Sequence, residues 1–178
     1  MLDRIQTRNE EIANGISHIL GVFFCLFAMP FLIVLAYREH NLVTVLSVLV
    51  FGIGMLLVYS FSSLYHLAQK EKTKQLLKIA DHISIYYLIA GTYSPLMVIY
   101  LNKETALVFL GIMWSIVLLG TFFKVFYVDR FKFLSVLFYL LMGWMIVFVI
   151  KPLWGVIPLS IFLWILAGGL SYTVGVYF

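Results

Sequence analysis

The chain is poor in charged residues and has no extended polar sequence. Only 11% of its 178 residues are charged, whereas 63% are hydrophobic, a composition far from that of a soluble domain. No polar stretch of about 20 residues is present that could fold as a soluble domain between apolar segments. The sequence therefore predicts an all-α integral membrane protein, a polytopic transmembrane helical bundle that forms one domain over residues 1–178.

Other absences exclude particular kinds of cross-link, metal site and processing. Cys25 is the only cysteine, which excludes an intrachain disulfide and a thiolate metal cluster. No small-residue cleavage site follows the first apolar run, so this run is predicted to stay in the protein as a helix. The net charge of +4 comes from basic residues that flank apolar segments, and it indicates orientation in a membrane. The predicted partners are membrane lipids, and no nucleic acid.

Apolar segments follow one another with short polar breaks. Each is near the ~20 residues that cross the hydrocarbon layer as a helix. Pro30 and Pro95 lie inside two of them and predict kinks. The six segments are Gly15–Tyr37, Leu42–Leu67, His82–Tyr100, Thr105–Phe126, Phe133–Ile150 and Ile157–Tyr177.

Basic residues predict the orientation of these segments. Nine lysines and arginines flank one side, in the N-terminal stretch and in the second and fourth breaks: Arg4, Arg8, Lys70, Lys72, Lys74, Lys78, Lys124, Arg130 and Lys132. Three flank the other side: Arg38, Lys103 and Lys151. Because cytoplasmic loops carry the excess of basic residues, the N-terminus is predicted to lie in the cytoplasm.

Polar side chains gather at the predicted cytoplasmic ends of the first three segments. Ser62 and His66 lie four residues apart, on one helix face, at the end of the second segment. Asp81 opens the third segment and is followed by His82. Glu11, Asn14, Ser17 and His18 lie around the start of the first segment. Since polar groups are expensive inside a membrane, this layer is the predicted functional site.

Two interpretations of this layer stay open at this point. In the structural one, Asp81 is a helix N-cap, the histidines are interfacial residues, and serines bond back to their own helix. In the functional one, the layer is half of a metal site, because imidazole binds Zn²⁺ and a nearby carboxylate and hydroxyl can orient a metal-bound water. His66 is then the metal ligand, and Ser62 and Asp81 are the catalytic residues.

Three motifs occur in order along the chain: Glu11-x-x-Asn14-x-x-x-His18, Ser62-x-x-x-His66, and Asp81 followed by Leu88-Ile89-Ala90-Gly91-Thr92-Tyr93-Ser94-Pro95. Together they resemble the bacterial hemolysin III family, which belongs with the progestin and adipoQ receptors and, more distantly, with the alkaline ceramidases. The resemblance covers essentially the whole chain in segment order.

The resemblance implies a seven-helix bundle in the bacterial inner membrane, with a cytoplasmic N-terminus and zinc in the inner layer. His66 would be one zinc ligand, and Ser62 and Asp81 would hold the metal-bound water. Family members carry a seventh helix whose His-x-x-x-His pair supplies the other two ligands. This chain reaches Phe178 after six segments and contains no such pair, so it is expected to lack the last helix and to present only part of the site.

Two further features bear on the missing ligands. Ala167, Ser171 and Gly175 recur every four residues in the last segment, a stripe that fits either the approach of another helix or an ordinary contact with the helices present. If the chain is complete, His66, His18 and His82 are the alternative ligand set.

Two functions of different classes remain. The first is a zinc-dependent hydrolase of lipid amide or ester bonds at the cytoplasmic membrane face, with Gly91 and Pro95 making room for an acyl chain. The alternative is a non-catalytic cytolytic, pore-forming or membrane-homeostasis protein. Against a pore, no segment carries a charged stripe through its whole length, which a water-filled lumen would favour.

Overall fold

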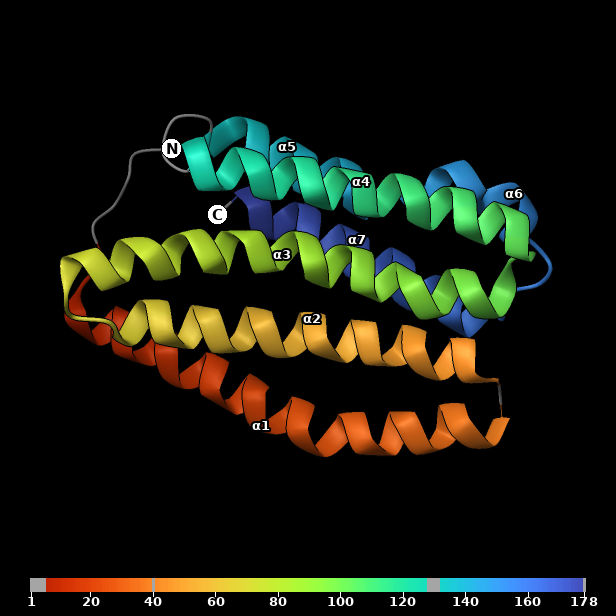
Figure 1. Cartoon of the computed structure of the whole chain (residues 1–178), viewed down its shortest axis with the longest axis horizontal. Helices are drawn as coiled ribbons and strands as arrows, with labels where there is room; N and C mark the ends of the chain where they lie inside the picture. Colours follow the sequence, from red (N-terminus) through yellow and green to blue (C-terminus); the bar gives the residue numbers. More distant parts are fainter. Residues whose placement is uncertain (1–5, 40, 128–131, 178) are drawn as a thin grey trace.

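The protein is a bundle of helices packed side by side (Figure 1). The computed structural model describes residues 6–39, 41–127 and 132–177, and these ranges contain no strand. The all-α prediction is confirmed. In chain order the elements are α1 Arg8–Glu39, α2 Leu42–Leu67, α3 Glu71–Tyr100, α4 Lys103–Tyr127, α5 Lys132–Gly143, the 3₁₀ helix η1 Met145–Val149, α6 Ile150–Leu153 and α7 Leu159–Tyr177.

The described residues form five helical stretches that are long and apolar enough to cross a membrane. They are Arg8–Arg38, Leu42–Leu67, Glu71–Tyr100, Lys103–Tyr127 and Phe133–Leu153. The sixth predicted segment forms a shorter apolar helix, Leu159–Gly175 by the same measure. The chain is therefore a multi-pass membrane protein whose segments follow one another in the predicted order.

The first helix begins seven residues before the predicted start at Gly15. Thr7 and Glu10 form a capping box, in which the Thr7 backbone N–H donates to the Glu10 carboxylate over 2.8 Å and the Glu10 N–H donates to Thr7 Oγ1 over 3.4 Å. This start places Glu11 within the helix. Figure 1 shows α1 changing direction part-way along its length, and Pro30 lies inside it.

The third helix begins eleven residues before the predicted start at His82. Its first turns contain strong helix formers with an acidic residue, Glu71, at the positive end of the helix dipole. Lys72, Lys74 and Lys78 are therefore helical, which corrects their placement in a loop. Asp81 lies well inside this helix, so the N-cap interpretation of that residue is wrong.

The fifth predicted segment is interrupted, although a continuous helix was expected over Phe133–Ile150. The α-helix ends at Gly143 and gives way to the η1 3₁₀ helix. The Tyr93 hydroxyl, from α3, donates to the Gly143 carbonyl over 2.6 Å and accepts from the Ile146 N–H over 3.2 Å. Tyr93 thus satisfies backbone groups that would otherwise be unpaired in an apolar layer, which is the condition for a broken helix in a membrane.

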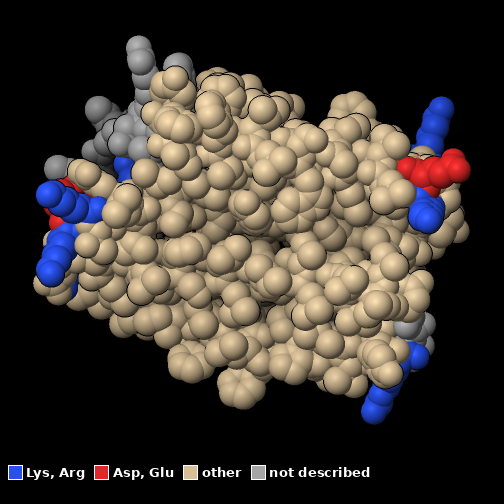
Figure 2. Space-filling view, in the orientation of Figure 1, with Lys and Arg blue, Asp and Glu red and all other residues tan. Residues whose placement is uncertain are grey.

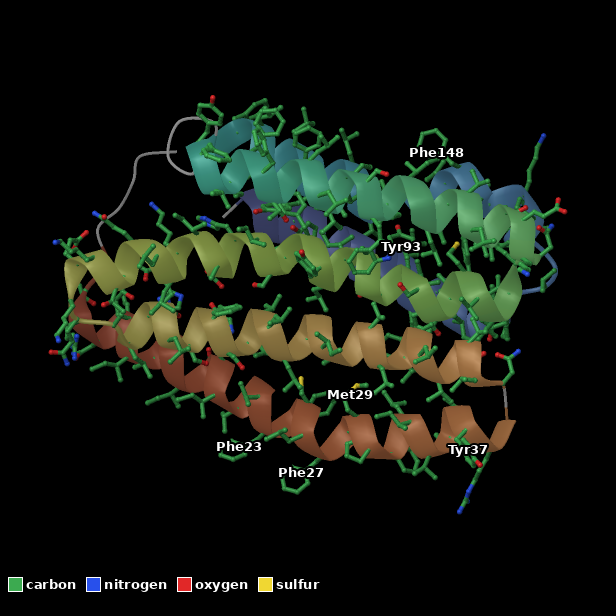
Figure 3. The ribbon with its side chains drawn as sticks, viewed as in Figure 1. Phe23, Phe27, Met29, Tyr37, Tyr93 and Phe148 are labelled. Carbon is green, nitrogen blue, oxygen red and sulfur yellow. The ribbon has the colours of Figure 1, made fainter. Side chains whose placement is uncertain are left out.

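The third helix is the centre of the bundle, because it packs against α2 on one side and against α4 and α5 on the other. Its residues Tyr86, Ala90 and Met97 are almost completely buried in the hydrophobic core. Figure 3 shows Tyr93 between α3 and α4, whereas Phe23, Phe27 and Tyr37 project away from α1. Charged residues collect at the two ends of the face seen in Figure 2, with an uncharged surface between them. This distribution fits a bundle surrounded by lipid.

Helices α2 and α3 approach each other through two glycines. A Cβ atom on Gly54 would lie 3.0 Å from Leu88 Cα and 3.0 Å from the Tyr87 carbonyl oxygen. One on Gly91 would lie 3.2 Å from Phe51 Cα. Because backbone atoms fill the space beside Gly91, the expectation that this glycine makes room for an acyl chain is wrong. Close backbone contact through small residues is a common way for membrane helices to pack.

We expect Gly54→Ala to destabilise the protein by about 1–3 kcal/mol, the usual cost of overpacking, because backbone must move to admit the methyl group. Thermal unfolding in lipid nanodiscs measures this effect as a lower Tm. Gly111→Ala is the control, since nothing lies within 4 Å of a Cβ atom at that position. Equal Tm values for the two variants would contradict the close approach.

Candidate functional site

The site lies where α1 begins, α2 ends and α3 begins, and we call this the site end of the bundle. Figure 1 places these three helix ends together, at the left of the view. Glu11 and His18 are two turns apart on α1, Ser62 and His66 are one turn apart on α2, and Asp81 faces them from α3. The predicted convergence of three helix ends on one layer is therefore seen in the structure.

Ser62 and Asp81 form the link between α2 and α3. The Ser62 hydroxyl donates to the Asp81 carboxylate, and His66 lies close enough to Asp81 for their charges to interact. Ser62 is 5% exposed, so this hydrogen bond is shielded from solvent. The adjacent Ser63 is equally buried at 5%, but its hydroxyl donates to the Tyr59 carbonyl of its own helix over 2.6 Å. Of these two serines, only Ser62 points its hydroxyl at an acid.

His66 is held by a carboxylate from α1. Its Nδ1 atom lies 2.9 Å from Glu11 Oε2. The other carboxylate oxygen, Glu11 Oε1, accepts a hydrogen bond of 2.7 Å from Lys74 Nζ at the beginning of α3. Glu11 therefore connects three helices through its two oxygens.

His18 lies against the face of the His66 ring. The two rings are nearly parallel, with an interplanar angle of 4° and centroids 5.8 Å apart. His18 also contacts the Tyr59 ring, whose centroid is 6.0 Å away. The imidazole of His66 is thus bounded by Glu11 at its edge and by His18 at its face.

The remaining predicted residues have other described contacts. Asn14 donates to the Gln6 side chain over 3.4 Å, near the beginning of α1. The backbone carbonyl of His82 accepts a hydrogen bond of 2.8 Å from the Tyr139 hydroxyl on α5. Ser17 and Ser84 donate to carbonyls of their own helices, as membrane serines often do. These contacts give structural roles to Asn14, Ser17 and Ser84.

Sequence reasoning missed Lys74 as a member of this site. It was treated only as a basic residue that sets orientation. Lys74, Lys78 and Asp81 are spaced at i, i+4 and i+7, so they share one face once α3 is known to begin at Glu71. That spacing was the available signal, and it depended on the helix start.

Comparison with known proteins identifies the family. Residues 6–178 match the protein family described as "Haemolysin-III related". The chain belongs to the hemolysin III family. It is 41% identical to the hemolysin-3 homolog of Bacillus subtilis (strain 168) over 172 residues. The aligned part is 97% of this chain and 81% of that relative. It is 40% identical to hemolysin-3 of Bacillus cereus over 169 residues, and the aligned part is 95% of this chain and 77% of that relative. No solved structure matches the chain.

The hemolysin III family resemblance implies zinc, and the side chains of the site fit part of a zinc centre. A ligating histidine typically donates its second ring N–H to a carboxylate, and His66 has such a partner in Glu11. In the described ranges, however, no three His, Cys, Asp or Glu side chains are grouped so that they could hold one metal ion. The set of His66, His18 and His82 is therefore not assembled there. If zinc binds here, these residues would provide one ligand with its outer partner, and a complete centre would need further donors.

The stripe of small residues in the last helix is open. Ala167, Ser171 and Gly175 are all exposed, and nothing lies within 4 Å of a Cβ atom built on Gly175. Helix α7 packs against α5 instead, and Trp144 at the interruption of the fifth segment donates to Thr173 over 3.1 Å. Of the two interpretations of this stripe, contact with the helices described here is therefore wrong.

Proposed function

We propose that this hemolysin III protein is a zinc-dependent hydrolase of lipid amide or ester bonds, acting at the cytoplasmic face of the bacterial inner membrane. The observation that carries the proposal is the Asp81 carboxylate, which accepts a hydrogen bond from Ser62 and faces His66 inside an apolar bundle. A carboxylate among apolar helices is expensive unless it has a function.

The chemistry would be shared among three residues. Asp81 can orient a water molecule and accept its proton as a general base, while Ser62 fixes the direction of the carboxylate. His66 would hold zinc through Nε2, because Nδ1 faces Glu11. When bound, zinc supplies a lowered pKa for its water and a Lewis acid for the carbonyl oxygen.

The position of the site along the helices is consistent with a lipid substrate. Ser62 and His66 lie in the last two turns of an apolar helix, and the lysine-rich beginning of α3 lies beyond them. Acyl linkages of membrane lipids are found at the same boundary between hydrocarbon and headgroups. A lipid carbonyl could therefore reach the site without leaving the bilayer.

Charge distribution supports the proposed orientation. Six described basic side chains are at the ends of helices that meet on the site-end side: Arg8, Lys70, Lys72, Lys74, Lys78 and Lys124. Arg38, Lys103 and Lys151 are on the opposite side. Arg4 and Arg130, which the sequence-based count includes, lie outside the described residues, as does the side chain of Lys132. By the positive-inside rule the site end faces the cytoplasm.

The adjacent serines provide a test. Ser62→Ala is expected to lower kcat for a lipid amide or ester by about 10-fold or more, because a hydrogen bond to a charged group contributes about 1.5–3 kcal/mol. Ser63→Ala, at equal burial, should leave kcat unchanged because it loses only a bond to its own helix. Hydrolysis is measured with the full chain in nanodiscs made of substrate lipid. If the two variants hydrolyse lipid equally well, Ser62 has no role in catalysis.

A cytolytic function is the second candidate, because the Bacillus cereus relative bears the name hemolysin-3. In that case the protein would perturb or perforate a target membrane. Figure 2 shows no charge across the middle of the face in view, which gives no support to a water-filled path there. Release of a trapped dye from vesicles discriminates the two, because lysis should tolerate Ser62→Ala and hydrolysis should not.

A further inference from the structure

We propose that Glu11 is a positioning residue that fixes the ring tautomer of His66 and is itself held in place by Lys74. The family motif contains Glu11 but the sequence gives it no role, and the contacts described above provide one. The effect on hydrolysis rests on the proposed function, whereas the effect on the tautomer does not.

The contact with Glu11 determines which nitrogen of the neutral His66 ring carries the proton. An ionised carboxylate only accepts hydrogen bonds. At 2.9 Å from Glu11 Oε2, Nδ1 must therefore carry the ring proton. The neutral ring then has its lone pair on Nε2, the nitrogen that is directed away from Glu11. In metal sites, the hydrogen bond made by one ring nitrogen of a histidine leaves the other nitrogen to bind the metal.

The Glu11 carboxylate is held in place by Lys74. Lys74 Nζ lies 2.7 Å from Glu11 Oε1 and 5.2 Å from the centroid of the Tyr65 ring. The ammonium favours the ionised form of Glu11, and the aromatic face helps to hold the ammonium in position. Each oxygen of Glu11 has its own partner, so the carboxylate has little freedom to rotate away from His66.

Glu11, His66 and Lys74 differ from an ordinary surface ion pair because they are largely buried. The side chains of His66 and Glu11 are 13% and 16% exposed, and that of Lys74 is 26% exposed. Stacking of His18 on the His66 ring closes one face of the imidazole. A ring confined at its edge and face has one orientation, which is the property that a metal ligand or a proton carrier needs.

The tautomer can be measured directly. The full chain, labelled with ¹⁵N-histidine and placed in lipid nanodiscs, contains four histidines, and His66→Gln identifies the His66 signals. At a pH where the ring is neutral, we expect wild-type His66 to show a protonated Nδ1 and a bare Nε2. In Glu11→Ala the signals should shift to a mixture of both tautomers, and Glu11→Gln should restore the wild-type state through its amide oxygen.

Glu10→Ala is the matched control, because this neighbouring carboxylate bonds to Thr7 instead of His66. It should leave the His66 signals unchanged. A wild-type ring protonated on Nε2 would overturn the proposal, and this result requires no variant to fold. Identical His66 signals in wild type and Glu11→Ala would overturn it as well.

A kinetic measurement distinguishes the two proposals from each other. Glu11→Ala is expected to lower kcat by about 10–100-fold with little change in KM, the usual effect of losing an outer partner of a metal ligand. If no variant of the site alters lipid hydrolysis while the tautomer changes as expected, the hydrolase proposal fails and the positioning role of Glu11 stands. If Ser62→Ala impairs hydrolysis but Glu11→Ala changes neither tautomer nor kcat, the positioning role fails alone.

Discussion

Asp81→Asn is expected to reduce kcat for lipid hydrolysis by at least about 100-fold, the lower end of what general acid–base catalysis contributes. Asparagine keeps the shape of the side chain and can still accept a hydrogen bond from Ser62. It cannot accept a proton from water. The loss should therefore appear in kcat, with the Tm and the oligomeric state of the purified protein unchanged.

Glu71→Gln is the matched control for this experiment. Glu71 lies on the same helix as Asp81 and is exposed, and its described partner is Gln75 at 3.2 Å. Removing its charge should leave hydrolysis at the wild-type level. Full activity in Asp81→Asn would show that this acid does no proton transfer, and the enzyme proposal would be withdrawn.

His66→Ala is expected to weaken zinc binding by more than about 100-fold, because losing even an outer partner of a ligand costs about 10–100-fold. Zinc content is measured by elemental analysis of protein purified in nanodiscs and dialysed against a defined free zinc concentration. Tyr65→Phe provides a control, since it retains the ring beside His66. Hydrolysis should fall in parallel with zinc content.

A second variant tests the alternative ligand set. His18→Ala removes the ring stacked on His66 and leaves the contact between His66 and Glu11 in place. Unchanged zinc content in this variant rules out His18 as a ligand. If His66→Ala retains wild-type zinc content, His66 is not a ligand, and the proposed metal-dependent mechanism is wrong.

The core of the site could be predicted from local spacing. Ser62 and His66 share a face because any helix places residues four apart on one side. Asp81 was placed at the same level because it follows a short break after the second apolar segment. Neither inference needed accurate helix boundaries: Asp81 lies beside Ser62 although it is well inside α3 and not at its start. The direction of the Ser62 hydroxyl could not be read from the sequence, since the adjacent Ser63 bonds to its own backbone.

The outer part of the site could not be predicted from hydropathy. An apolar run marks only the residues inside the hydrocarbon layer, whereas the helices continue beyond that layer. The first helix begins at a capping box formed by Thr7 and Glu10, and the third begins at Glu71. These extensions bring Lys74 to Glu11. Both residues belong to charged stretches that hydropathy assigns to loops.

The interruption of the fifth segment was hidden for a different reason. Hydropathy there is continuous, and Gly143 alone would be tolerated in a helix. The alternative backbone path depends on the Tyr93 hydroxyl, fifty residues earlier in the chain. A hydrogen bond between residues so far apart in the sequence does not change the local pattern of apolar and polar residues.

The position of α3 at the centre of the bundle has a consequence for biosynthesis. Every side chain placed in the candidate site lies between Glu11 and Asp81, on the first three helices to leave the ribosome. The helices are synthesised in chain order, so the acid, the alcohol and the imidazole are all present before α4 has been made. Later helices would then pack against side chains that are already in contact.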